Sequence, residues 1–219
     1  DDVTLYIQLN PSVDILFDDT LVCEQTVFDF TNLVDYANHN AAIWVAVNGS
    51  GDWSDNTIDY PTYTLSQSDA IQGFVNITVQ ATALDPCSVL DDDQCTISVQ
   101  QLPVIDAGAD QTICEDGSAT LSDATALEAE SLLWTDILAT DGTFDDATLL
   151  NPEFTPGQNA IDLGYTTLKL EAQPLEPCVT VVEDQVTIYI QDLPVVDAGI
   201  DATVCEDLDF MLDGSLENT

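Results

Sequence analysis

Hydrophobic and polar residues alternate with a period of two along most of this chain. The alternation is clear over residues 3–9, 74–81, 166–172 and 186–190, where apolar residues occupy every second position. A period of two is typical of strands that are buried on one face. Turn-forming Asp, Gly, Pro and Asn separate these segments. Only residues 124–131 resemble a short helix, and we expect a loop there.

The sequence is also internally repetitive. The segment PVIDAGADQTICE at 103–115 recurs as PVVDAGIDATVCE at 194–206, with nine of thirteen positions identical and an offset of 91 residues. An earlier copy at 11–24 carries one extra residue, and residues 93–103 match 184–194 in the same way. Repetition at a fixed period indicates a series of similar domains.

These repeats predict the domain organisation. Residues 11–102 and 103–193 are two whole repeats, each with a tryptophan between two cysteines. Residues 1–10 match the last strand of a preceding repeat, and residues 194–219 match the start of a further one. Several short strands in about 91 residues indicate an all-β fold of tandem immunoglobulin-like β-sandwich repeats. We therefore expect the parent protein to continue beyond this chain.

The cysteines are spaced regularly. Cys23 lies 64 residues before Cys87, and Cys114 lies 64 residues before Cys178. This spacing favours the pairs Cys23–Cys87 and Cys114–Cys178, one disulfide per repeat, each at one end of a sandwich. The partner of Cys205 is then expected near position 269, outside this chain.

Cys95 has no counterpart in the other copies. It replaces Val3 and Val186 at an inward strand position. We interpret it as a buried free thiol that packs like a small apolar side chain, with an additional crosslink as the alternative. Matching disulfides are typical of secreted proteins, because they form in oxidising compartments.

Charge excludes several classes of function. The chain has 41 acidic residues against one basic residue, Lys169, and a formal net charge of −40. Nucleic acid is excluded as a partner because phosphate contacts need Lys or Arg. No apolar run reaches the length of a membrane span. The lone histidine, His39, is expected to be solvated, and no nucleophilic set can be built around it. We therefore expect no enzymatic activity.

Acidic residues near the repeat junctions are candidate Ca²⁺ ligands, because hard cations bind several oxygens. The alternative is that these residues form turns and cap backbone N–H groups. The candidates are Asp91, Asp92, Asp93, Asp106, Asp110, Asp197 and Asp201.

The strings at 103–115 and 194–206, together with residues 142–144 and 151–156, resemble the repeats of giant cell-surface proteins of Bacteroidota, including the gliding-motility adhesins. They are also similar to polycystic-kidney-disease (PKD) type domains of immunoglobulin-like fold. This resemblance implies export by type 9 secretion and display on the outer cell surface. Repeat 11–102 departs from it, because Ile-Leu-Phe replaces Ala-Gly-x, so its linker is expected to pack differently.

Three modification patterns are short matches. Asp19-Thr20-Leu21 looks like the O-glycosylation acceptor used by Bacteroidota, which makes Thr20 a candidate. Asn48 and Asn76 begin N-glycosylation patterns that we attribute to chance.

Together these features favour a structural and adhesive stalk in a large extracellular adhesin or filament. Its partners are neighbouring repeats of the same chain, and surface polysaccharide or other cells. One alternative is a carbohydrate-binding module that uses Trp53, Tyr60 and Tyr63 as stacking surfaces. Another is a filament subunit in which strand 2–9 completes a neighbouring chain in trans.

Overall fold

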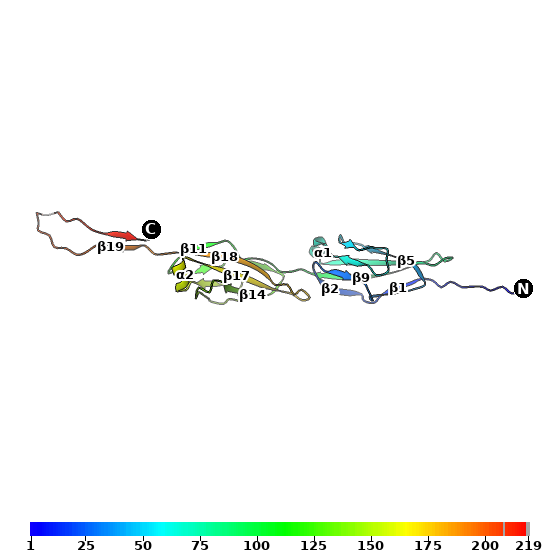
Figure 1. Cartoon of the computed structure of the whole chain (residues 1–219). Coiled ribbons are helices and arrows are strands. Elements are labelled where there is room, and N and C mark those ends of the chain that lie inside the picture. The colour runs from blue at the N-terminus through cyan, green and yellow to red at the C-terminus, as the bar shows by residue number, and fades with distance from the viewer. Residues whose placement is uncertain (208, 218–219) are drawn as a thin grey trace. The chain divides into compact units, whose positions relative to one another are not determined.

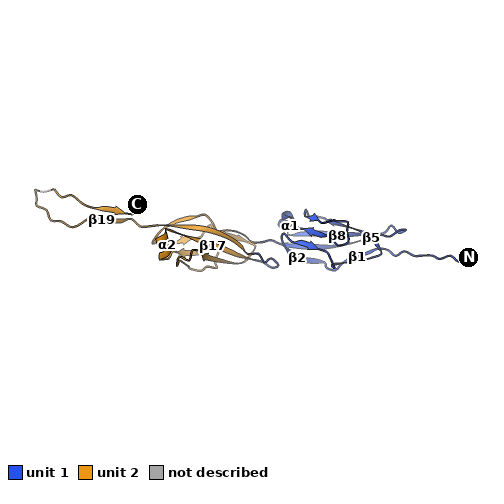
Figure 2. Ribbon diagram, viewed as in Figure 1, with its two compact units in different colours: residues 1–102, 174–180 blue, residues 103–173, 181–219 orange. Residues whose placement is uncertain are grey.

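The computed structural model describes residues 1–207 and 209–217, and its elements are almost all strands (Figure 1). The predicted all-β class is therefore confirmed. The chain forms two compact units (Figure 2). Unit 1 comprises residues 1–102 and 174–180, and unit 2 comprises residues 103–173 and 181–219. Unit 1 thus includes a short segment of the second sequence repeat.

Unit 1 contains three sheets. The largest has the order β2-β9-β8-β5, the second β3-β7-β6, and the third pairs β1 with β4. All pairings are antiparallel except that of β2 with β9, which is parallel. The elements are β1 (Ser12–Ile15), β2 (Asp19–Cys23), β3 (Val27–Asp29), β4 (Val34–Ala37), β5 (His39–Ala46), β6 (Asp52–Trp53), β7 (Thr62–Thr64), α1 (Gln67–Gln72), β8 (Phe74–Ala83) and β9 (Leu90–Gln100).

Unit 2 repeats this arrangement. Its four-stranded sheet has the order β11-β18-β17-β14, with β11 parallel to β18, and its three-stranded sheet has the order β12-β16-β15. The elements are β10 (Val104–Asp106), β11 (Gln111–Cys114), β12 (Ala119–Thr120), β13 (Thr125–Leu127), β14 (Ala129–Asp136), β15 (Thr143–Phe144), β16 (Glu153–Thr155), α2 (Gln158–Leu163), β17 (Tyr165–Pro174), β18 (Val182–Gln191), β19 (Val195–Asp197) and β20 (Ser215–Glu217).

Each unit has its own apolar core between its sheets. In β8 and β17 the alternation predicted from sequence places every second side chain in the core. Trp44 on β5 and Trp134 on β14 are buried at the centres of the two cores. Trp44 packs on Phe30, with ring centroids 4.4 Å apart, and each indole N–H donates to a backbone carbonyl.

Two short helices were not predicted. α1 and α2 occupy equivalent positions before β8 and β17, and each ends at a glycine with left-handed backbone, Gly73 or Gly164. The segment 124–131, expected as a loop, instead contains β13 and the start of β14. No helix in the described ranges is long and apolar enough to span a membrane.

The linker of repeat 11–102 was expected to pack differently, and its residues do. Phe17 lies against the core of unit 1, with its ring centroid 5.8 Å from that of Phe28. In the second repeat the corresponding region contains Gly108, whose φ of 88° is left-handed. A bulky side chain packs in one copy, and a turn glycine is used in the other.

The terminal segments differ in structure. Residues 2–9, expected as a strand, form none here, because a strand needs a neighbour to satisfy its backbone hydrogen bonds. Their apolar side chains are exposed, Val3 by 94%. In residues 194–217, β19 pairs with β20 as β10 pairs with β13. Residues 208, 218 and 219 of the expected further repeat lie outside the described residues.

Candidate functional site

The first cysteine of each whole repeat is the last residue of a strand. Cys23 is the last residue of β2 and is in register with Gln100, the last residue of β9. Cys114 is the last residue of β11 and is in register with Gln191, the last residue of β18. Parallel pairing therefore places each of these cysteines at the carboxyl end of the last strand of its repeat.

The second cysteine of each repeat lies in the connection before that last strand. Cys87 lies between β8 and β9, and Cys178 lies between β17 and β18. The two connections have the same local turn. The Cys87 N–H donates to the Leu84 carbonyl over 3.0 Å, and the Cys178 N–H donates to the Leu175 carbonyl over 3.0 Å.

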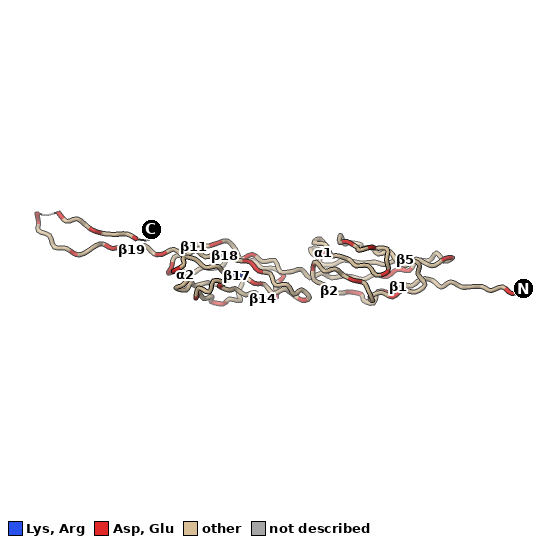
Figure 3. The backbone as a smooth tube through the Cα atoms, viewed as in Figure 1, with Lys and Arg blue, Asp and Glu red and all other residues tan. Residues whose placement is uncertain are grey.

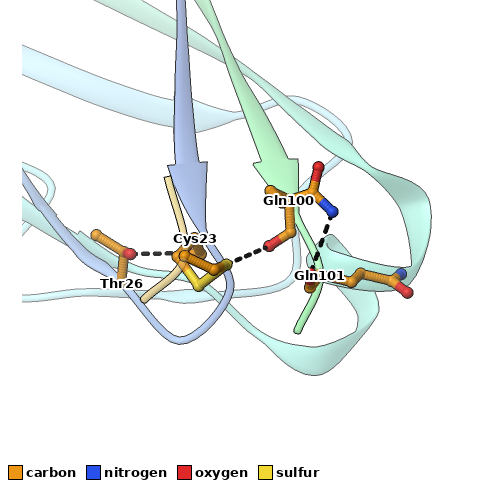
Figure 4. The surroundings of a disulfide bond; sticks show 5 residues. Cys23, Thr26, Gln100 and Gln101 are labelled. Carbon is orange, nitrogen blue, oxygen red and sulfur yellow. Dashed lines mark hydrogen bonds between the residues drawn. A yellow bond between two sulfur atoms is a disulfide. The ribbon is translucent and has the colours of Figure 1, made fainter. Parts of the chain in front are cut away.

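The observed disulfide joins Cys23 to Cys178, so the pairs Cys23–Cys87 and Cys114–Cys178 predicted from spacing are wrong. The bonded cysteines are 155 residues apart in sequence and their Cα atoms are 4.9 Å apart. Figure 4 shows this bond beside the end of β9, where the Cys178 sulfur lies 3.5 Å from the Gln100 carbonyl oxygen. Both cysteines belong to unit 1, because residues 174–180 are part of it.

Sheet geometry explains why pairing within a repeat fails. Cys23 is paired with Gln100, the last residue of β9. Cys87 instead lies just before Leu90, the first residue of β9. At about 3.3 Å per residue, the ends of this strand lie roughly 30 Å apart. A disulfide requires Cα atoms within about 7 Å. Cys114 and Cys178 lie at opposite ends of β18 in the same way.

The other cysteines are free in the described part of the chain. Cys87 is half-buried, and Cys114 and Cys205 are exposed. Cys95 is a buried free thiol on β9, 4% exposed. Burial, followed by the nearby charges of Asp93 and Asp19, raises the pKa of Cys95 to about 12. Such a thiol remains protonated at neutral pH and is a poor nucleophile.

The candidate calcium ligands are mostly engaged with backbone. Asp91 accepts from the Val13 N–H over 2.9 Å, and Asp93 accepts from the Ile15 N–H over 2.6 Å, which fastens β1 to β9. Asp106 accepts from Gly108. In the same way Asp197 accepts from the Gly199 N–H, and Asp110 from the Thr187 N–H. Asp92 and Asp201 are exposed.

Within residues 1–207 and 209–217, no three His, Cys, Asp or Glu side chains come together as a metal site. The acidic residues are distributed over both units (Figure 3). Lys169 lies on β17, where its ammonium is 3.2 Å from carboxylate oxygens of both Glu171 and Glu183. The hydrogen bonds to Glu171 and Glu183 raise the pKa of Lys169 above its usual value.

The aromatic residues proposed for carbohydrate stacking do not form one exposed surface. Tyr63 is fully buried, and Trp53 packs between Tyr63 and the core residues Phe30 and Trp44. Of the three, only Tyr60 is exposed, by 44%. The structure therefore gives no support to a stacking platform formed by these three rings.

His39 was expected to be solvated and is not. Its ring stacks on that of Tyr36 with centroids 4.5 Å apart, and its Nε2 lies 3.0 Å from Asp59 Oδ1. The Tyr36 hydroxyl donates to the Asp59 carbonyl. Burial and then the charge of Asp59 raise the pKa of Tyr36. The group holds β4 and β5 against the loop that precedes β7.

The modification candidates lie on strands or beside them. Thr20 is half-buried and is the second residue of β2. The Asn48 amide oxygen accepts from the Asn76 N–H over 2.7 Å, and the Asn76 amide oxygen accepts from the Thr96 hydroxyl. The Asn48 side chain thus ties the bend after β5 to β8, and the Asn76 side chain ties β8 to β9.

No protein-family model matches this chain, and no curated protein matches it. Among solved structures, mouse cadherin-23 domains EC22–24 are 13% identical over 85% of this chain and 67% of that one, with a TM-score of 0.49. Drosophila N-cadherin EC1–4 is 14% identical over 84% of this chain, with a TM-score of 0.47. Protocadherin gamma B7 domains 1–4 are 13% identical, with a TM-score of 0.46. The chain spans 56% of the protocadherin structure and 50% of the N-cadherin structure. A likeness at this level says nothing about what the chain binds.

Proposed function

We propose that this chain is a run of structural and adhesive repeats in a large extracellular surface protein, where it forms part of a stalk. The observation that carries the proposal is the interlocking of consecutive sequence repeats. Unit 1 includes residues 174–180 of the second sequence repeat, and the Cys23–Cys178 disulfide holds them there. Modules that act independently have no need of such a link.

Equivalent residues with equivalent tasks support a repeating structure. Asp93 binds the Ile15 N–H, and its counterpart Asp184 binds the Ala107 N–H over 2.7 Å. In both copies this carboxylate hydrogen-bonds a backbone N–H and so holds two segments of the repeat together, which suits a structural scaffold. We propose the boundaries 11–102 and 103–193 for the two whole repeats, with residues 194–219 beginning a further one.

The disulfide and the composition support an extracellular location. Disulfides persist in oxidising environments, and a surface with 41 acidic residues is strongly solvated. On the resemblance of residues 103–115 and 194–206, we assign the chain to the outer surface of a bacterium that uses type 9 secretion, in the manner of gliding-motility adhesins. Its proposed partners are surface polysaccharide or other cells, and it has no enzymatic role.

Antibodies against this chain provide the test. We expect them to label intact, unpermeabilised cells and their Fab fragments to reduce attachment of the cells to a surface. Fab fragments against a periplasmic protein serve as the control. Labelling that appears only after permeabilisation contradicts the proposed location. Surface labelling without any loss of attachment supports a structural stalk and contradicts the adhesive role.

A filament linked by donor strands is the second candidate, and residues 3–9 favour it. Their alternating apolar side chains are exposed and match the pattern of the last strand of a repeat. Such a segment is able to complete a preceding repeat of its own chain or one of another chain. Sedimentation distinguishes the two: polymers of this chain that disappear when Val3, Leu5 and Ile7 are replaced by Asp favour pairing in trans.

A further inference from the structure

The observed crosslink consists of three parts. They are a cysteine at the end of the second strand of a repeat, the carbonyl of a glutamine that ends the last strand, and a loop cysteine. In unit 1 these are Cys23, Gln100 and Cys178. The Glu24 N–H donates to that same Gln100 carbonyl over 2.8 Å and fixes the chain beyond Cys23. We call this three-part arrangement the crosslink site.

A second set of residues forms the loop half of such a site. The Cys87 sulfur lies 3.7 Å from the carbonyl oxygen of Gln8. Gln8 holds the position in segment 2–11 that Gln100 holds in segment 93–103. Cys87 itself lies 91 residues before Cys178 and shares its turn. Cys87 therefore contacts the segment whose sequence matches a preceding last strand, as Cys178 contacts Gln100, but without a bonded cysteine.

A third set forms the strand half. Cys114 is in register with Gln191, and the Glu115 N–H donates to the Gln191 carbonyl over 2.9 Å. These contacts reproduce those of Cys23 and Glu24 around Gln100. Cys114 is exposed, whereas Cys23, which is bonded, is half-buried. Unit 2 therefore contains the whole strand half of a crosslink site. Cys114 in it is not bonded to a loop cysteine.

We propose that Cys87 and Cys114 are unfilled halves of this crosslink, and that in the longer protein each pairs with a cysteine of a further repeat of the same kind. The partner of Cys114 is then a cysteine 155 residues later, near position 269. The spacing within repeats had instead assigned that cysteine to Cys205. The partner of Cys87 lies 155 residues earlier. Cys205 takes the same role as Cys114 one repeat further on. The inference rests on the proposed array of repeats and specifies how its members are joined.

Each bond forms by ordinary thiol–disulfide exchange. Two protein thiols lose two protons and two electrons, and one S–S bond forms between them. An external disulfide, either a small molecule or an oxidised dithiol protein, accepts the electrons and protons and becomes two thiols. No group of this chain other than the two cysteines takes part in the electron balance.

Overlap between successive bonds gives the array its mechanical property. Cys114 lies inside the loop closed by Cys23 and Cys178, so the next crosslink begins before the first one ends. The shortest covalent path from Cys23 to Cys205 crosses the disulfide and then follows residues 178–205. Tension on the ends therefore bypasses residues 24–177, and unfolding of their strands releases no chain length while the disulfide is intact.

Counting reactive thiols in the present chain is the first test. After refolding in a glutathione redox buffer, iodoacetamide should modify Cys87, Cys114 and Cys205 but neither Cys23 nor Cys178. Cys95 should react only after unfolding, because it is buried and its pKa is about 12. Pairing within each repeat predicts protection of Cys87 and Cys114, and that result overturns the proposal.

A chain with an additional repeat tests the pairing directly. A second copy of residues 103–193 is inserted after Leu193, which preserves the Leu-Pro junction found at 102–103 and 193–194. The only tryptic sites of this longer chain are Lys169 and its counterpart in the inserted copy, because Lys169 is the only Lys or Arg. Trypsin applied after alkylation and unfolding without reduction therefore gives an N-terminal, a middle and a C-terminal fragment, held together only by disulfides.

The proposal predicts that Cys114→Ser releases the C-terminal fragment and leaves the other two joined through Cys23–Cys178. The matched control replaces the counterpart of Cys114 in the inserted copy and should release nothing. Pairing within repeats predicts that Cys114→Ser releases the N-terminal fragment, and that the control releases the C-terminal one. The Cys23–Cys178 link in the same digest verifies folding. A failure of this pairing leaves surface display and attachment, which the antibody experiment measures, unaffected.

Discussion

At the scale of single residues, the most informative group is a buried carboxylate in unit 1. Asp69 is 1% exposed and accepts from the Ser50 N–H over 2.8 Å, the Ser66 N–H over 2.9 Å and the Tyr63 hydroxyl over 3.1 Å. Tyr63 in turn accepts from the Gly51 N–H over 2.7 Å. Burial alone raises the pKa of Asp69, but these hydrogen bonds together lower it below its usual value.

Unit 2 has replaced both members of this pair. The counterparts of Tyr63 and Asp69, 91 residues later, are Phe154 and Ala160, and both are fully buried. The hydroxyl and the carboxylate that it bonds are therefore absent together. A buried polar group is costly when its partner is removed but not when both are replaced by apolar groups.

A double-mutant cycle tests this coupling. We expect Asp69→Ala to destabilise unit 1 by about 2–3 kcal/mol, since it leaves buried donors unpaired. Tyr63→Phe should cost about 1–2 kcal/mol. The double variant should cost less than the sum, with a coupling energy of at least about 0.5 kcal/mol. Urea unfolding provides the free energies. Strict additivity contradicts the proposed pair.

The pH dependence of stability follows from the same group. Because the folded pKa of Asp69 is lowered, its contribution is fully present above the unfolded pKa of about 3.9 and is lost as the pH falls through the folded pKa. The stability difference between the native chain and Asp69→Asn should therefore shrink as the pH falls from 5 to 2. Urea unfolding of both chains across this range measures it. A constant difference rules out the lowered pKa.

Sequence alone identified much of the core but not this pair. In β8 and β17 the alternation assigns the buried positions correctly, because each strand is long enough to show a period of two. Tyr63 lies on β7, which has only three residues, and its burial depends on packing against Trp53. A period cannot be read from so short a strand, so the sequence left open whether this ring packs in the core or belongs to an exposed stacking surface.

At the scale of elements, the two helices were missed for a similar reason. α1 and α2 have six residues each, fewer than two turns, so no apolar stripe develops. The available signal was the Ser66-x-x-Asp69 pair followed by Gly73, a capping box and a left-handed C-cap. The N-cap of α2 is Gly157, which provides no side-chain hydrogen bond, and only the C-cap Gly164 repeats the signal.

A reciprocal exchange of the N-cap residues should affect the two helices differently. Ser66→Gly removes the hydrogen bond to Asp69 and should cost unit 1 less than about 1 kcal/mol. Gly157→Ser adds a capping hydroxyl but places a Cβ against the backbone of Asp141. It should therefore cost unit 2 about 1–3 kcal/mol. Calorimetry of both variants measures the effect. If Gly157→Ser is instead more stable, the backbone around Asp141 moves enough to accommodate the added Cβ, and the expected clash is wrong.

The disulfide pairing failed at this scale because spacing in a repetitive chain is ambiguous. When two cysteines each recur after 91 residues, separations of 64 within a repeat and 155 across repeats recur equally well. The deciding fact is the parallel pairing of β2 with β9, which places Cys23 at the far end of β9 from Cys87. Strand ends were predictable from sequence, but which strands are neighbours was not.

At the scale of the whole molecule, charge is the dominant feature. A net charge of −40 creates repulsion that disfavours the compact state. Part of this repulsion is offset locally, since carboxylates such as Asp91, Asp106 and Asp184 accept backbone N–H groups. Lys169 is the only Lys or Arg in the sequence, so positive side chains offset very little of this charge. The composition therefore predicted the repulsion, whereas its local compensation depends on strand register.

Salt should stabilise this protein without a requirement for calcium. Raising NaCl from 0.01 M to 1 M shortens the screening length from about 30 Å to about 3 Å, so the melting temperature should rise by a few °C or more. Because Asp106, Asp110 and Asp197 already bind backbone N–H groups, Ca²⁺ and Mg²⁺ at equal ionic strength should have equal effects. Calorimetry of the chain in each salt, after treatment with EDTA, measures both expectations. A larger shift with Ca²⁺ that is lost in Asp106→Asn identifies a calcium site at the start of the second repeat, and a larger shift that survives this substitution places such a site elsewhere.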